Sequence, residues 1–142
     1  MALGVWVKLA RAASTMGKLS SENIRAFGLT EPQFAALECL GHLGTLKLSV
    51  LSKKMLVSGG NLTIIIDNLE KERLVERIPS KEDRRAILVQ LTSKGQKLFK
   101  DIFLKHAEFI ANIASVLTEK EQQALANLLK KLGITLRDRY LN

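Results

Sequence analysis

A single apolar stripe between Ser58 and Glu72 constrains the fold of this chain more than any other feature of its sequence. Four residues recur there at the spacing of one helix face, namely Leu62, Ile65, Ile66 and Leu69. The stripe predicts an amphipathic helix with one buried face, and Ser58 is its candidate N-cap. A second short helix is expected within 46–55, with Ser49 as its N-cap, which leaves about three residues between the two helices. This spacing is typical of a helix-turn-helix.

The hydrophobic period changes after this helix. Two runs rich in branched residues, 74–78 and 86–91, predict short β-strands, and the charged segment 79–85 between them predicts a turn. Two strands joined by a basic loop directly after a helix-turn-helix form a wing. We therefore expect a mainly α fold with a small two- to three-stranded β-wing, a winged helix-turn-helix domain, over residues 29–95.

Start and stop signals mark the remaining helices. Four residues are candidate N-caps: Thr30, Ser58, Thr92 and Thr118. Gln33 and Glu121 stand where they complete capping boxes with the first and last of these. Gly28 is expected to end a first helix over 3–26, and Gly41 and Gly44 are expected to close the second.

The helix predicted over 95–117 is long and carries apolar residues on more than one face. Such a helix needs more partners than a small domain provides. We therefore predict that residues 1–28 and 96–142 form a helical dimerisation region and that the protein is a homodimer.

Charge narrows the class of partner. The 142 residues carry 22 Lys and Arg against 14 Asp and Glu, a net charge of +8, which favours nucleic acid or an anionic membrane surface. No apolar run approaches the roughly 18 residues of a membrane span. The single cysteine, Cys39, allows no intramolecular disulfide and no cysteine-based zinc cluster, and no metal or cofactor is expected.

The first residues lack the basic residues that precede a secretory signal, so a cytoplasmic protein is expected. The acid-free stretch up to Ser21 has the composition of an organellar presequence. An ordinary first helix is the favoured interpretation, because the other apolar helices need a partner.

The motifs between Leu29 and Gly95 resemble, in order and spacing, the MarR family of bacterial and archaeal regulators. They are Leu29-Thr30, Gln33-Phe34, Leu37, Leu48-Ser49, Val57-Ser58, Gly60-Asn61-Leu62-Thr63, Asp67, Leu69-Glu70, Leu74-Val75, Arg77, Asp83-Arg84-Arg85, Leu91-Thr92 and Gly95. The resemblance implies a homodimer that binds a pseudo-palindromic operator, usually as a repressor, and is released by a small aromatic ligand or by cysteine oxidation. The chain departs from the family at Arg73, where glycine is usual. If that position is left-handed, arginine costs about 1 kcal/mol relative to glycine.

The exposed side of the Ser58–Glu72 helix is the candidate surface for base recognition, because a recognition helix reads bases through its N-terminal turns. Asn61 can pair with adenine, and Thr63 can bond a base or phosphate or touch a thymine methyl group. Gly59 and Gly60 would allow the backbone to approach a phosphate closely. Ile64 is expected to be exposed, and either thymine methyl groups or a neighbouring loop would cover it.

Charge is distributed unevenly over this surface. Residues 58–73 carry a net charge of −1, whereas residues 77–100 carry seven basic and two acidic side chains. Attraction to phosphates must therefore come mainly from the wing and the helix after it. The candidate cations are Lys53, Lys54, Arg77, Lys81, Arg84 and Arg85. The resemblance implies that Asp83 orients Arg85, which enters the minor groove; a solvated hairpin tip is the plainer interpretation.

A ligand pocket between the first, second and fifth helices is a further expectation. Its candidate lining residues are Trp6, Phe34, His42 and His106, although each is more often a core residue than a ligand contact. Cys39 is expected to be buried and inert, so redox control is not expected.

Two other functions are alternatives to DNA binding. The first is a dimeric winged-helix module that binds a protein, which the net negative helix supports. The second is an enzyme, for which the sequence offers no paired carboxylates, no nucleophile with a base and no phosphate-binding glycine loop.

Overall fold

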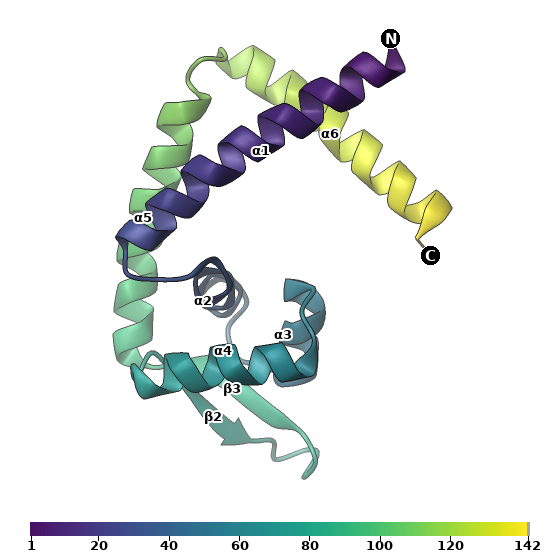
Figure 1. Ribbon diagram of the computed structural model, residues 1–142. Helices are drawn as coiled ribbons and strands as arrows, with labels where there is room; N and C mark the ends of the chain where they lie inside the picture. Colours follow the sequence, from purple (N-terminus) through teal and green to yellow (C-terminus); the bar gives the residue numbers. More distant parts are fainter. Residues whose placement is uncertain (142) are drawn as a thin grey trace. The chain divides into compact units, whose positions relative to one another are not determined.

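The computed structural model describes residues 1–141, and Figure 1 shows its elements. The helices are α1 (Ala2–Ala26), α2 (Glu31–Leu43), α3 (Leu48–Met55), α4 (Gly59–Lys71), α5 (Ser93–Ala114) and α6 (Glu119–Tyr140), and the strands are β1 (Leu46–Lys47), β2 (Val75–Pro79) and β3 (Ile87–Leu91). The predicted fold class, mainly helical with a small β-wing, is confirmed. The chain divides into two compact units, Met1–Ala107 and Glu108–Asn142, and the end of the predicted 96–142 region, residue 142, lies outside the described residues.

The sheet of the first unit has three antiparallel strands in the order β1-β3-β2. Leu46 and Arg77 both pair with Val89, one from each side of β3. Figure 1 shows α4 lying next to the hairpin of β2 and β3. This arrangement places the wing beside the predicted recognition helix.

The predicted caps are confirmed with one exception. Thr30 and Thr118 form capping boxes, Ser58 Oγ accepts from the Asn61 N–H at 3.2 Å, and Thr92 Oγ1 accepts from the Gly95 N–H at 3.0 Å. The exception is Ser49, because α3 begins one residue before it. Pairing of the preceding two residues with β3 sets that start.

The core of the first unit centres on side chains of α2, α3, α4 and β3. Several residues are fully buried: Ala36, Leu37, Leu51, Ile66, Leu69 and Val89. The predicted stripe of α4 therefore faces inward, with Ile65 half-buried at its edge. Burying such aliphatic side chains contributes roughly 1.5–3 kcal/mol each, which is the main source of helical stability here.

The prediction that Gly41 closes α2 is wrong, because Gly41 lies inside the helix and Gly44 ends it. A Cβ on Gly41 would lie 2.4 Å from the Phe99 ring. Gly41 is therefore a site of close packing rather than a stop signal.

Among residues 1–141, two residues other than glycine adopt left-handed backbone conformations. Leu56 (φ 55°) stands in the turn between α3 and α4, and Arg73 (φ 59°) stands in the turn between α4 and β2. Gly28 and Gly44 hold similar φ values at the ends of α1 and α2. Arg73 therefore holds the left-handed conformation in which arginine costs about 1 kcal/mol relative to glycine.

The second unit contains the end of α5 and all of α6. The long helix ends at Ala114 rather than at 117, and the Leu117 N–H bonds the Ala114 carbonyl at 3.0 Å. Within the described residues α6 buries no side chain. Six of its apolar residues are 40–65% exposed: Leu125, Leu128, Leu129, Leu132, Ile134 and Leu136. Across residues 1–141 no helix combines the length and apolar character needed to cross a bilayer.

Candidate nucleic-acid interface

The first two turns of α4 present the predicted recognition surface to solvent. Gly59, Gly60, Asn61, Thr63 and Ile64 are all exposed, and the stripe on the opposite side is buried. Nothing lies within 4 Å of a Cβ built on either glycine. Neither glycine is required by packing inside the chain, so their bare backbone is available to an outside partner.

Thr63 and Ile64 give this surface an apolar character. Thr63 Oγ1 donates to the Gly59 carbonyl at 3.0 Å, so its hydroxyl hydrogen is already used. Ile64 is 61% exposed. The neighbouring-loop alternative for Ile64 is therefore not realised in the described chain.

Arg77 of β2 forms a clasp between the wing and α4. Its guanidinium donates to Asp67 at 2.7 Å and to Glu70 through a shorter contact. Its Nη2 also reaches the Thr63 carbonyl at 3.5 Å. Burial by itself would lower the pKa of Arg77, but the hydrogen bonds to Asp67 and Glu70 outweigh it and raise the pKa. Arg77 therefore neutralises the acidic flank of α4, and its contact with a phosphate stays a prediction.

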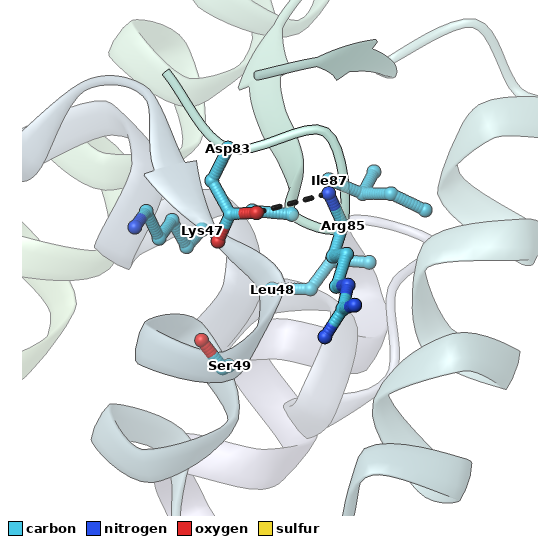
Figure 2. Close-up of a pocket in the computed structure, with 7 residues that line it drawn as sticks. Lys47, Leu48, Ser49, Asp83, Arg85 and Ile87 are labelled. Carbon is cyan, nitrogen blue, oxygen red and sulfur yellow. Dashed lines mark hydrogen bonds between the residues drawn. The ribbon is translucent and has the colours of Figure 1, made fainter. Parts of the chain in front are cut away.

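The tip of the wing is ordered by Asp83. Its Oδ1 accepts from the Arg85 N–H at 3.0 Å (Figure 2), and its own N–H donates to Ser80 Oγ at 3.2 Å. Asp83 therefore orients Arg85 through the backbone rather than through the guanidinium. Lys81, Arg84 and Arg85 are all exposed, as the predicted role in phosphate attraction requires.

A hollow of about 360 Å³ separates the wing from the start of α3. Its lining residues are Lys47, Leu48, Ser49, Asp83, Arg85, Ala86 and Ile87. Lys47, at the end of β1, and Arg85, in the wing, both line it (Figure 2). Lys47 was not among the predicted cations, because its proximity to the wing depends on the pairing of β1 with β3. Lys53 and Lys54 are exposed in the last turn of α3.

The four candidate pocket residues do not all lie together. Phe34 is buried, and its ring lies 4.9 Å from the His106 ring in an edge contact. His106 Nδ1 lies 2.8 Å from Asn23 Oδ1 of α1. His42 packs instead against Phe99 and Phe103, with ring centroids 5.2 and 4.7 Å away, and Trp6 is 63% exposed. The first unit thus brings together Phe34 and His106 of the four.

Cys39 is half-buried. Burial raises the pKa of its thiol, Glu38 raises it further, and Lys54 opposes both. The thiol form dominates at neutral pH as a result. Among residues 1–141 no group of three or more His, Cys, Asp or Glu side chains could hold a metal ion.

Comparison with known proteins gives concordant matches. The MarR family profile matches residues 29–87. The Bacillus subtilis helix-turn-helix transcriptional regulator MhqR is 36% identical over 132 residues, covering 93% of this chain and 91% of MhqR. A mutant of Escherichia coli MarR bound to operator DNA superposes with a TM-score of 0.77 at 27% identity over 93% of this chain and 94% of the other. The complex of NadR with 4-hydroxyphenylacetate gives 0.73 at 27% identity over 89% of each chain. The chain belongs to the MarR family of helix-turn-helix transcriptional regulators.

Proposed function

We propose that this DNA-binding regulator is a cytoplasmic, ligand-responsive repressor that binds a pseudo-palindromic operator as a homodimer. The observation that carries the proposal is the pairing of two surfaces. The first turns of α4 are exposed and uncharged, and the adjoining wing carries the exposed cations Lys81, Arg84 and Arg85. Contacts to bases determine which sequence is bound, and contacts to phosphates position the protein on the duplex. We assign the first task to α4 and the second to the wing.

The dimer is supported by the apolar surface of α6. Contiguous apolar patches beyond a few hundred Å² are unusual on monomers, and α6 leaves six large apolar side chains 40–65% exposed. We assign dimerisation to 1–28 and 96–142 and DNA binding to 29–95. A two-fold protein requires two half-sites, which gives the pseudo-palindrome.

Release by an aromatic ligand is supported by two solved relatives of this fold. NadR was crystallised with 4-hydroxyphenylacetate, and a structure of Bordetella bronchiseptica BpsR concerns regulation of its DNA binding by 6-hydroxynicotinic acid. In this chain the ring of Phe34 on α2 contacts the ring of His106 on α5. An aromatic ligand that binds there would replace this contact with its own ring. A thermal-shift screen of aromatic acids tests this. An effector should raise the melting temperature of the free protein, because it binds the folded state. It should also weaken DNA binding, and DNA should weaken effector binding by the same factor.

Operator binding is tested by fluorescence anisotropy with the DNA upstream of the protein's own coding sequence, at two salt concentrations. Arg85→Ala should weaken binding by more than about 1 kcal/mol and reduce the salt slope by about one. Lys105→Ala, an exposed cation of α5 outside the predicted interface, is the matched control. Unchanged affinity of a folded Arg85→Ala protein would remove the minor-groove role. Binding that fails to appear, or that does not depend on salt, would favour the protein-interaction module.

A further inference from the structure

We infer that α4 reads thymine methyl groups, so that A·T base pairs face its first two turns in each half-site. The reader is a methyl surface formed by Thr63 and Ile64 beside the bare backbone of Gly60, and Asn61 supplies the hydrogen-bonding contact. This inference rests on the proposed function and specifies the class of DNA sequence that the same site recognises.

The first step is the absence of a cation where bases are read. Residues 59–66 contain no charged side chain, and the basic residue of α4 is Lys71 in its last turn. The commonest specific contact to guanine uses Arg or Lys on O6 and N7. These turns cannot make that contact, whereas the amide of Asn61 suits N6 and N7 of adenine.

The second step is the state of the Thr63 side chain. Because its hydroxyl donates to the Gly59 carbonyl at 3.0 Å, the hydrogen that would bond a base acceptor is occupied. The hydroxyl oxygen can still accept from a base amino group, but it has no hydrogen left for the acceptor O4 of thymine or O6 and N7 of guanine. The methyl group of this exposed residue is therefore the part that can contact thymine. Thymine differs in the major groove from the other bases by its C5 methyl group, which is the natural partner for this surface.

The third step is the position of Ile64 on the helix. Gly60 and Ile64 are four residues apart and so lie one above the other. The two flanking positions of the same exposed face hold Asn61 and Thr63. An apolar side chain that is 61% exposed beside a backbone with open space above it leaves room for a base edge to approach and cover it.

The expected size of the effect follows from burial of methyl groups. One buried methyl group contributes about 0.8 kcal/mol, which corresponds to about a fourfold change in Kd. If one methyl contact is lost in each of the two half-sites, the affinity of the dimer for the whole operator should fall about fifteenfold.

The test uses a duplex that the full-length protein enriches from a random-sequence library. This duplex is synthesised with thymine or with uracil, which keeps base pairing and removes the C5 methyl. The wild-type protein should bind the uracil duplex about fifteenfold more weakly. Thr63→Val, which keeps the methyl group, should preserve most of this ratio. Thr63→Ser and Ile64→Ala should each reduce it toward one.

The outcomes separate this inference from the function on which it rests. Enrichment of a duplex that binds equally well with thymine or uracil overturns methyl reading and leaves DNA binding intact. A ratio that stays the same in Ile64→Ala and in Thr63→Ser also overturns it, since the methyl groups would then act through DNA shape or another element. Failure to enrich any duplex overturns both.

Discussion

Replacement of Arg73 by glycine should stabilise the protein. Arg73 holds φ 59°, and a residue with a Cβ pays about 1–2 kcal/mol in this region. Its backbone contacts would survive the change, because its N–H donates to the Glu70 carbonyl at 2.9 Å and its carbonyl accepts from Thr92 Oγ1 at 2.6 Å. Within residues 1–141 its guanidinium forms no ion pair that the change would remove.

The gain is reduced by the freedom that glycine adds to the unfolded chain, roughly 0.4–1 kcal/mol. The free energy of unfolding should therefore rise by about 0.5–1 kcal/mol. Urea denaturation followed by circular dichroism measures this, at one fixed protein concentration because the stability of a dimer depends on concentration.

The neighbouring residue provides a matched control. Glu72 has right-handed angles, φ −76° and ψ −4°, so Glu72→Gly relieves no strain and should destabilise the protein by about 0.5–1 kcal/mol. Backbone strain at Arg73 thus predicts effects of opposite sign for two adjacent substitutions. If Arg73→Gly is neutral or destabilising, like Glu72→Gly, the strain at Arg73 does not limit stability and the reasoning is refuted.

Three further predictions concern the core, the clasp and the thiol. Gly41→Ala should cost about 1–3 kcal/mol by overpacking against the Phe99 ring, whereas Gly17→Ala, in open space on α1, should be neutral or stabilising; equal melting temperatures would contradict this. Arg77→Met keeps the apolar stem but removes both ion pairs, and should lower the free energy of unfolding by about 1 kcal/mol, less at 1 M salt; a loss that salt does not change would show that packing, not charge, carries the clasp. Because burial raises the pKa of Cys39, its alkylation should be slow at neutral pH and accelerate only in alkaline solution, and peroxide should leave DNA binding unchanged; rapid labelling at pH 7 would contradict an inert thiol.

Local signals in the sequence predicted local structure well. The capping boxes at Thr30 and Thr118 and the cap at Ser58 depend on residues three positions apart, so their chemistry can be recognised directly. The buried stripe and the exposed Ile64 follow from helical periodicity in the same way.

The errors at Ser49 and Gly41 and the missed bonds of Arg77 depend on contacts between distant segments. Ser49 has the side chain of an N-cap, but the pairing of β1 with β3 makes α3 begin at Leu48, one residue earlier. Glycine is the usual residue at the end of a helix, so Gly41 looked like a stop signal. The close approach of the Phe99 ring from α5 explains why glycine stands there instead. The bonds from Arg77 to Asp67 and Glu70 span 10 and 7 residues, and their signal in the sequence is an acidic pair three residues apart on α4 that precedes a basic strand residue.

Arg77 changes how the negative charge of the recognition helix should be interpreted. Taken along the sequence, residues 58–73 carry a net charge of −1, which weighed against DNA binding. In the fold, the guanidinium of Arg77 bonds to Asp67 and Glu70, so it brings the local balance to zero. A neutral α4 adds little to phosphate attraction, and the salt dependence of binding should follow the wing cations while the choice of sequence follows α4. Substitutions in the two surfaces should then change two different measured quantities, the salt slope and the base preference.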